Sequence, residues 1–406
     1  MAKDKKQKKW IRFRHRVVRN IAYLILYPYS RIKYRIHIEK FKGQKNTPYL
    51  ILLNHQTPFD QFFVGMSFKG PIYYLATEDI FSNGWVSTLI KWLVAPIPIK
   101  KQAGDVAAVK TCIRVAREGG TICIAPEGNR TYSGKTEYMS DAIAPLARKL
   151  KLPIALYRIE GGYGAEPRWS DVVRKGKMRS YVSRVIEPEE YQSMTDDELF
   201  EIIQDGLYVN EAVSDCEYHH KKRAEYLERA IYVCPYCGLS KFYSHNNIIE
   251  CQNCGREIEY TPDKRLKGIG FDFEFNFVND WYEYQKDFVN SLDTNNYISA
   301  PLFRDTANIS EVIIRKKKVL MRKNAEIALY GDRIVIDKGD KDQITFLFND
   351  ISVISVLGRN KLNIYYGDKT YQLKSDKRFN ALKYVNIYYR HKNITKRNES
   401  EQFLGL

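Results

Sequence analysis

A histidine and an aspartate five positions apart are the residues whose types and spacing most directly suggest catalysis. His55 and Asp60 lie in the segment Asn-His-Gln-Thr-Pro-Phe-Asp, residues 54–60. A carboxylate within reach of an imidazole ring can hold that ring in one orientation, which is how a histidine is usually prepared to act as a general base. The alternative is that Asp60 only closes a helix capping box and that His55 is an ordinary loop histidine.

The elements around this segment would place the pair at a strand-to-helix corner. The apolar residues 49–53 predict a buried strand. Thr57 is a favourable helix N-cap, Pro58 suits the first helical position, and Asp60 falls at the third. We therefore expect a helix over residues 59–68, with the histidine in the loop that precedes it.

Cysteine spacing predicts a zinc ribbon later in the chain. Two Cys-x-x-Cys-Gly segments are separated by twelve residues after the first glycine, and each glycine stands where a knuckle turn favours it. Four thiolates from two such turns can surround one Zn²⁺ tetrahedrally and leave no open position, so the predicted zinc is structural. A redox role is the alternative, and the likeness of the two pairs counts against it. The predicted ligands are Cys234, Cys237, Cys251 and Cys254.

The other three cysteines carry no such pattern. Cys112 and Cys123 fall on apolar faces and are expected in the core, and Cys216 is left over. An odd total of seven cysteines without a signal peptide predicts a reducing cytoplasm rather than a disulfide framework.

The positive charge of the chain is concentrated at its beginning. Of the net charge of +17, eleven charges fall within residues 1–40, which hold thirteen Lys or Arg against two acidic residues. The apolar run at residues 21–27 lies between these cations and is far shorter than the ~20 residues that span a bilayer. It lacks a signal-peptide cleavage site. We expect an arm that lies in the plane of an anionic membrane surface, on its cytoplasmic face, as in a peripheral or monotopic protein. The alternative is a helix that docks on the chain's own core.

Strands and helices alternate after this arm. Gly119-Gly120 ends one helical pattern, and polar residues recur at strand ends, where α/β folds tend to place their sites. This order predicts an α/β domain with a central mixed sheet flanked by helices. Strands are expected at residues 49–53, 72–76, 95–101, 121–125 and 153–159, and helices at 59–68, 85–93, 105–117 and 142–149.

The C-terminal part has a different pattern. A capping box, Thr195 with Glu198, predicts a helix over residues 199–209. After the ribbon comes an aromatic-rich stretch. Short alternating strands then predict an all-β barrel of the pleckstrin-homology type. These strands are expected at residues 325–330, 333–337, 344–348, 351–357, 361–366 and 369–374, followed by a helix at 379–389.

Two segments, residues 54–60 and Ala-Pro-Glu-Gly-Asn-Arg at 125–130, carry a resemblance that extends over residues 40–190. The chain resembles there the glycerolipid acyltransferase family that acylates lysophosphatidic acid. The first block of that family is similar to residues 54–60, which keep its His-(four residues)-Asp core, and the third, Phe-Pro-Glu-Gly-Thr-Arg, to Ala-Pro-Glu-Gly-Asn-Arg at 125–130. The second and fourth blocks correspond to 98–101 and 152–155. The departures leave the acceptor open: Lys101 stands where the family usually has Arg, Ala125 replaces an aromatic residue, and Asn129 replaces Thr.

The resemblance implies acyl transfer with His55 as general base and Asp60 as the group that orients it. A thioester donor needs no protein nucleophile when the acceptor hydroxyl can be deprotonated as it attacks. The other implied site residues shape the acceptor site (Glu127 and Gly128) or neutralise its phosphate (Arg130 and Lys101).

The expected function is therefore transfer of a fatty acyl chain at a membrane surface. The donor would be acyl-CoA or acyl carrier protein. The acceptor would be a lysophospholipid, with 1-acyl-sn-glycerol 3-phosphate giving phosphatidic acid. The alternatives are another lipid acceptor, or a zinc-ribbon adaptor that binds nucleic acid or protein. Basic residues around the ribbon are few, so no nucleic-acid partner is expected.

These inferences give a linear map of the chain. The expected parts are a basic amphipathic arm (1–40), a glycerolipid acyltransferase domain (41–215), a charged linker (216–230), a zinc ribbon (231–262), an aromatic-rich connector (263–308), a pleckstrin-homology-like domain (309–392) and a polar tail (393–406).

Overall fold

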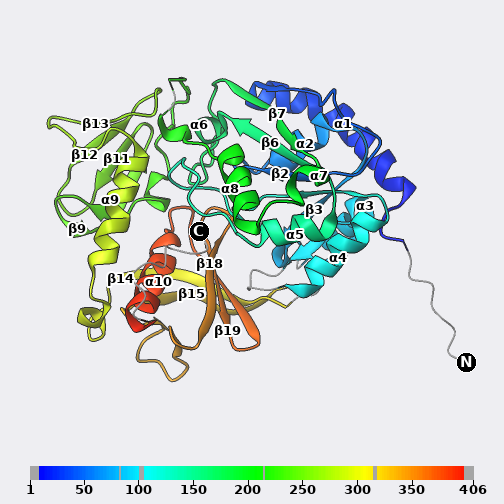
Figure 1. Ribbon diagram of the computed structural model, residues 1–406. Helices are drawn as coiled ribbons and strands as arrows, with labels where there is room; N and C mark the ends of the chain where they lie inside the picture. Colours follow the sequence, from blue (N-terminus) through cyan, green and yellow to red (C-terminus); the bar gives the residue numbers. More distant parts are fainter. Residues whose placement is uncertain (1–8, 82–83, 100–104, 214, 314–317, 397–406) are drawn as a thin grey trace, which may run out of the picture. The chain divides into compact units, whose positions relative to one another are not determined.

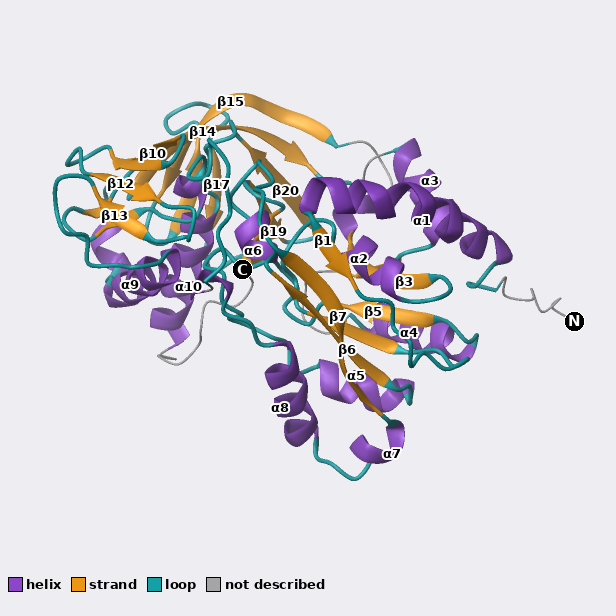
Figure 2. Cartoon of the chain, turned by 90° about the horizontal axis from the view of Figure 1, so that it is seen from above, coloured by secondary structure: helices purple, strands orange, loops and turns teal. Residues whose placement is uncertain are grey.

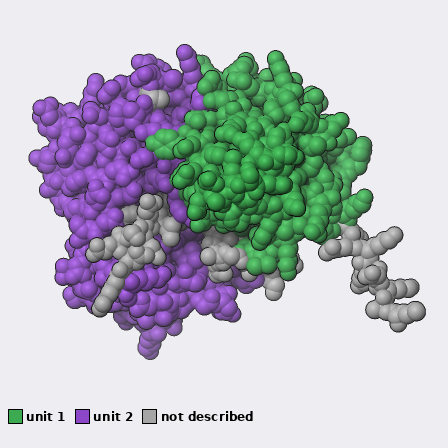
Figure 3. Space-filling view, viewed as in Figure 1, with its two compact units in different colours: residues 1–126, 139–159, 179–208 green, residues 127–138, 160–178, 209–406 purple. Residues whose placement is uncertain are grey.

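The computed structural model in Figure 1 describes residues 9–81, 84–99, 105–213, 215–313 and 318–396. The chain divides into two compact units that are coloured separately in Figure 3. The first unit comprises Met1–Pro126, Met139–Ile159 and Arg179–Tyr208, and the second comprises Glu127–Tyr138, Glu160–Met178 and Val209–Leu406. The boundary therefore crosses the predicted acyltransferase domain, because two of its internal segments belong with later residues.

A seven-stranded sheet forms the centre of the first unit. Its strand order is β1-β7-β6-β2-β5-β3-β4, and the pairs β6–β2, β2–β5, β5–β3 and β3–β4 are parallel. Parallel strands covered on both faces are apolar along their whole length, as in β2, where all four residues are buried. The strands are β1 (Ile36–Ile38), β2 (Leu50–Leu53), β3 (Ile72–Thr77), β4 (Ile97–Ile99), β5 (Thr121–Ile124), β6 (Ile154–Glu160) and β7 (Met178–Ile186).

Helices cover both faces of this sheet (Figure 2). Leu50 and Leu52 share one apolar cluster with residues of α4, α5 and α8. On the opposite face, the Tyr34 ring meets Phe63 of α2 edge-on, and Phe68 packs against Tyr157. The capping box predicted at Thr195 and Glu198 is present. The helices of this unit are α1 (Phe13–Tyr34), α2 (Asp60–Ser67), α3 (Trp85–Val94), α4 (Val106–Arg117), α5 (Ile143–Leu150), α7 (Pro188–Tyr191) and α8 (Asp196–Leu207).

Helix α1, which lies in the described part of the basic arm, has two different sides. His15 is buried and its Nδ1 lies 3.0 Å from the Tyr73 hydroxyl, and Ser30 and Tyr34 are buried as well. Large apolar side chains on the remaining surface are exposed. The helix thus packs against its own unit, in line with the alternative that it docks on the chain's own core. Its other side still exposes apolar side chains to solvent. Among the residues that the structure describes, no helix is both long enough and apolar enough to cross a bilayer.

The second unit contains two small antiparallel sheets around the paired cysteines. Strands β8 (Val233–Cys234) and β9 (Gly238–Leu239) pair with each other. Four further strands follow in the order β10-β11-β12-β13. Their bounds are Phe242–His245, Ile248–Cys251, Glu257–Tyr260 and Leu266–Gly268.

A seven-stranded antiparallel sheet, here called the C-terminal sheet, completes the second unit. Its order is β17-β16-β15-β14-β20-β19-β18, and α10 packs against β18. The sheet is barrel-like, as predicted, and the six predicted strands are confirmed. The strands are β14 (Phe303–Glu311), β15 (Val319–Leu329), β16 (Arg333–Ile336), β17 (Ile344–Leu347), β18 (Ile351–Leu357), β19 (Lys361–Tyr366) and β20 (Lys369–Lys374).

Three details differ from the expected map. The boundary at residue 309 falls inside β14, and the expected connector contains helix α9 (Val278–Ser291). The last helix, α10, spans Leu382–Lys396 rather than 379–389. Its start is set by Asn380, whose Oδ1 accepts a hydrogen bond from the Lys383 backbone N–H at 3.0 Å. The second unit also contains the one-turn helix α6 (Gly162–Ala165).

Candidate functional site

Asn54 fixes the corner that follows β2. Its side chain is fully buried and makes two hydrogen bonds to one residue of β6. Nδ2 donates to the Ile159 carbonyl at 2.8 Å, and Oδ1 accepts from the Ile159 N–H at 2.8 Å. The amide thus extends the pairing of β2 with β6 by one further residue, and the next residue, His55, leaves the sheet at a defined point. In the sequence, this asparagine stands out only as part of the 54–60 segment, and no local pattern indicates its role.

His55 and Asp60 are in direct contact. His55 Nδ1 lies 2.7 Å from Asp60 Oδ2, and the two side chains are 27% and 1% exposed, respectively. An ionised carboxylate only accepts hydrogen bonds, so a neutral imidazole must carry its proton on Nδ1. Nε2 is then the ring atom with the lone pair. This arrangement is that of a histidine held in one tautomer by a carboxylate, which is what a general base requires.

The Asp60 carboxylate also organises the loop before the helix. It accepts hydrogen bonds from the Gln56 N–H at 2.7 Å, the Thr57 N–H at 2.9 Å and the Thr57 hydroxyl at 2.7 Å. The capping box is therefore partly formed. The Asp60 carboxylate accepts a hydrogen bond from the Thr57 N–H while it also contacts His55. The prediction that Thr57 is the N-cap is wrong by two residues. Helix α2 begins at Asp60 after Phe59, because the carboxylate draws the 56–57 backbone into a separate turn.

The second predicted segment, residues 125–130, lies at a unit boundary. Pro126 ends a stretch of the first unit, and Glu127 begins a stretch of the second. Glu127 and Arg130 are both buried. Gly128 has a φ of +69° with open space around the position of a Cβ, so the backbone conformation rather than crowding favours glycine here.

The residues predicted to take part in acyl transfer thus fall into three groups. His55 and Asp60 meet in the first unit, whereas Glu127, Gly128 and Arg130 share one short segment of the second. The predicted phosphate ligand Lys101 lies outside the described residues.

Cys112 and Cys123 of the first unit are buried thiols, as expected from their apolar faces. Burial raises the pKa of Cys112 to about 12 and that of Cys123 well above its usual value. A buried thiol that stays protonated at neutral pH is a poor nucleophile.

The four paired cysteines form a compact thiol cluster in the second unit. The Sγ atoms of Cys234, Cys237, Cys251 and Cys254 all lie within 4.8 Å of one another, and Cys234 Sγ is 3.9 Å from Cys254 Sγ. Four sulfurs at ~2.3 Å from a tetrahedral Zn²⁺ lie about 3.8 Å apart, so the cluster fits the ion. The knuckle glycines Gly238 and Gly255 have φ values of +73° and +69°, which explains why glycine stands at both turns.

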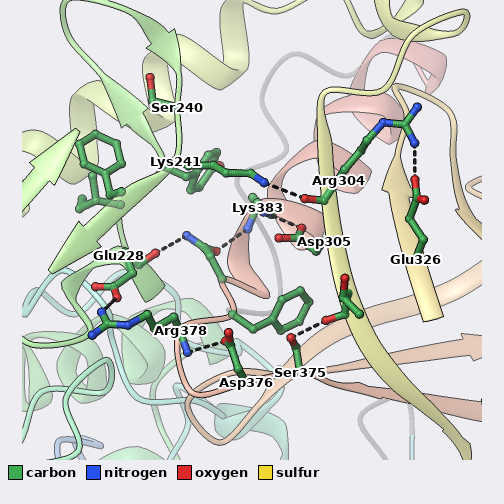
Figure 4. Close-up of a pocket in the computed structure, with 16 residues that line it drawn as sticks. Glu228, Ser240, Lys241, Arg304, Asp305, Glu326, Ser375, Asp376, Arg378 and Lys383 are labelled. Atoms are coloured by element: carbon green, nitrogen blue, oxygen red, sulfur yellow. Dashed lines mark hydrogen bonds and ion pairs between the residues drawn. The ribbon is translucent and has the colours of Figure 1, made fainter. Parts of the chain in front are cut away.

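A polar cavity of about 550 Å³ lies elsewhere in the second unit (Figure 4). Most of the charged side chains that line the cavity form ion pairs with one another. Arg378 pairs with Glu228, Arg304 with Glu326, and Lys383 with Asp305 at 2.7 Å. Of the predicted acyl-transfer residues that the structure describes, none lines this cavity.

Comparison with known proteins finds similarities to the N-terminal part of the chain. Residues 33–158 match the family model described as Acyltransferase. The 1-acyl-sn-glycerol-3-phosphate acyltransferase of Bacillus subtilis (strain 168) is 21% identical over 146 residues, which are 36% of this chain and 69% of that protein. A chloroplastic 1-acyl-sn-glycerol-3-phosphate acyltransferase of Arabidopsis thaliana is 23% identical over 186 residues, 43% of this chain. The chain spans 49% of the length of that plant relative.

Among solved structures, the crystal structure of the 1-acyl-sn-glycerophosphate (LPA) acyltransferase PlsC from Thermotoga maritima is similar to this chain. The superposition has a TM-score of 0.38 at 19% identity and covers 47% of this chain and 74% of the other.

Proposed function

We propose that this chain, whose residues 33–158 form an acyltransferase-family domain, transfers a fatty acyl chain to the hydroxyl of a lysophospholipid. The acceptor is 1-acyl-sn-glycerol 3-phosphate, the product is phosphatidic acid, and the donor is acyl-CoA or acyl carrier protein. The observation that carries the proposal is the 2.7 Å contact of His55 Nδ1 with the buried Asp60 carboxylate inside that domain. The relatives named as acylating 1-acylglycerol 3-phosphate support the choice of acceptor.

The proposed reaction needs no covalent enzyme intermediate. His55 Nε2 takes the proton of the acceptor hydroxyl as its oxygen attacks the thioester carbonyl. The carbon–sulfur bond breaks, and the imidazolium returns the proton to the leaving thiolate. Asp60 holds the ring and stabilises the imidazolium, as carboxylates do in comparable pairs. General-base assistance of this kind accelerates a reaction by about 10²–10⁴-fold.

Residues of the second segment would bind the acceptor. Arg130 and Lys101 would neutralise the phosphate, and Arg suits this task because its guanidinium matches phosphate oxygens in a bidentate manner. Glu127 and the left-handed turn at Gly128 would shape the site around the glycerol. The role of Lys101 rests on the likeness of residues 98–101 to the family's second block, and the other roles rest on the likeness of residues 125–130 to the third.

Two further parts of the proposal concern the surroundings of the reaction. The exposed apolar side chains of α1 and the basic residues beside them suit an anionic membrane surface, where lysophospholipid is found. A Zn²⁺ held by Cys234, Cys237, Cys251 and Cys254 would stabilise the ribbon and take no part in the chemistry. We propose that the protein lies on the cytoplasmic face of the membrane and that it has no nucleic-acid partner.

An acceptor screen with the purified protein tests the proposal. With a labelled acyl-CoA or acyl carrier protein as donor, lysophosphatidic acid should be acylated much faster than monoacylglycerol, which has the same hydroxyl but no phosphate. Equal rates with both would contradict the phosphate-binding role of the second segment. If only a different lysolipid were acylated, the proposed acceptor would be wrong, but the proposed reaction class, acyl transfer, would stand.

A further inference from the structure

Arg168 is a buried arginine that is 2% exposed and donates its hydrogen bonds to backbone carbonyls. Nη1 donates to the Arg130 carbonyl at 2.8 Å, Nε to the Gly358 carbonyl at 3.0 Å, and Nη2 to the Val356 carbonyl at 3.0 Å. One guanidinium therefore joins the Pro-Glu-Gly-Asn-Arg segment to the end of β18 and the turn after it. All four residues belong to the second unit, within which these contacts lie.

A second set of contacts holds the same turn, residues 358–360, against the Glu127–Tyr138 segment. The buried Tyr132 hydroxyl donates to the Arg359 carbonyl at 2.8 Å, and the Tyr132 ring lies 4.4 Å from the Arg168 guanidinium carbon. The Arg359 side chain pairs with Glu166 and lies 3.6 Å from Asp171. The turn is thus held by Tyr132 and by two acidic residues, Glu166 and Asp171, that lie on either side of Arg168 in the sequence.

The type of residue at position 168 matters for this connection. Three carbonyls arranged around one planar group match the fixed fork of a guanidinium, and an ammonium on a flexible stem cannot reach all three together. A buried cation is also costly unless its donors are satisfied. The Arg130 carbonyl is consequently held in place by a group that is itself held by β18.

We propose that Arg168 is a positioning residue for acceptor binding, and that the turn after β18 supports the segment that carries Arg130. The proposal rests on the proposed function, because Arg130 is there the phosphate ligand. The C-terminal sheet then supports the acceptor-binding segment: through Arg168, its turn sets where the Arg130 backbone, and with it the guanidinium, is placed.

The test compares Arg168→Lys with Arg333→Lys in the full-length protein. Arg333 is a matched control, because its guanidinium carbon lies 4.4 Å from the Tyr330 ring and it donates to the Ile298 carbonyl at 3.0 Å, away from the Arg130 segment. We expect Arg168→Lys to raise KM for lysophosphatidic acid about tenfold or more, the loss expected when charge-assisted hydrogen bonds are misplaced. KM for the donor should not change. A fall in kcat alone, or equal changes in both KM values, would overturn the proposal.

A double variant separates positioning from general damage. If Arg168 acts through Arg130, Arg168→Lys should add no further loss in an Arg130→Gln background, whereas multiplied losses would overturn the proposal. Tyr132→Phe removes one hydroxyl and should shift the acceptor KM in the same direction by a smaller factor. It keeps the test usable if Arg168→Lys does not fold.

Hydrogen exchange provides a readout that does not depend on activity. Amides of residues 127–138 should exchange faster in Arg168→Lys than in the wild type and in Arg333→Lys, and unchanged exchange would overturn the support role of the turn. If the wild type does not acylate lysophosphatidic acid, the proposed function fails on that assay, while the exchange measurement still decides whether Arg168 holds this segment.

Discussion

At the scale of single residues, Asp60 does two jobs with one carboxylate. It accepts from three donors in residues 56–57 and from the His55 ring. A buried carboxylate with this many donors is a well-satisfied group, and its hydrogen bonds fix both the loop and the ring. The capping and catalytic interpretations of the aspartate are therefore not exclusive.

Asp60→Asn tests this double role. The amide has the same size, but its NH₂ group cannot accept a hydrogen bond, so either the loop or the ring loses a partner. We expect kcat to fall by about 10²-fold or more and the free energy of unfolding to fall by about 2 kcal/mol. Steady-state kinetics and thermal denaturation measure the two effects.

Asp105→Asn is the matched control for Asp60→Asn. Asp105 caps α4 by accepting from the Ala108 N–H at 3.0 Å, and Asn caps helices about as well as Asp. Its stability and activity should stay near those of the wild type. An Asp60→Asn protein that behaves like this control would contradict the role of Asp60.

Some residue-scale features follow from the sequence and others do not. His55 and Asp60 are close in sequence at a strand-to-helix corner, so their contact was predictable from local rules. The partner of Asn54 lies 105 residues away, and Arg168 reaches a carbonyl 188 residues away. No local pattern marks a side chain whose acceptor is a distant backbone carbonyl.

At the scale of elements, α1 and α3 carry most of the large exposed apolar side chains among the described residues of the first unit. Phe13, Leu24 and Ile32 of α1 are 79%, 73% and 80% exposed, and Trp85 and Trp92 of α3 are exposed as well. The two helices contact each other. The sequence indicated α1 through its basic and apolar composition, whereas α3 was predicted only as a helix.

Substitutions on α1 test its membrane role without disturbing the core. Replacing Leu24 and Ile32 by Asp removes two side chains that would each contribute ~1.5–3 kcal/mol when buried in lipid. We expect the affinity for anionic vesicles to fall by about 100-fold or more. Cosedimentation with phosphatidylglycerol vesicles measures the change, and Val106→Asp on α4, also an exposed apolar position, should bind like the wild type. Undiminished binding of the double variant would place the membrane contact elsewhere.

The elements missed in residues 263–308 have a common cause. Helix α9 is built from aromatic and polar residues, and only part of β14 alternates clearly between buried and intermediate or exposed positions. Some of their core contacts, such as Trp281 with Phe242, are made with residues outside this stretch. Tertiary packing rather than local periodicity therefore defines these elements.

At the scale of the whole molecule, the two units are not consecutive stretches of sequence. Segments Glu127–Tyr138 and Glu160–Met178 belong to the unit that contains the ribbon and the C-terminal sheet. A linear domain map assigns each residue to its sequence neighbours and cannot describe this arrangement. The α/β class with a central mixed sheet and the barrel-like sheet were predictable, but the way that the segments combine was not.

Zinc content tests the proposed ribbon. Metal analysis of the purified protein should find about one Zn²⁺ per chain, since four thiolates complete one tetrahedral site. Cys254→Ser should lose the metal and lower the melting temperature of the second unit, because binding energy in such sites is folding energy. Cys216→Ser, which changes a cysteine outside the cluster, should keep the metal. A folded protein free of metal would refute the zinc site.

The central claim is that His55 is the general base, and His55→Ala tests it most directly. The variant should retain the wild-type melting temperature within a few degrees, and its rate of acyl transfer to lysophosphatidic acid should fall by about 10²–10⁴-fold. His37→Ala, which changes an exposed histidine of β1, should keep the wild-type rate. Full activity of a folded His55→Ala protein would contradict the account.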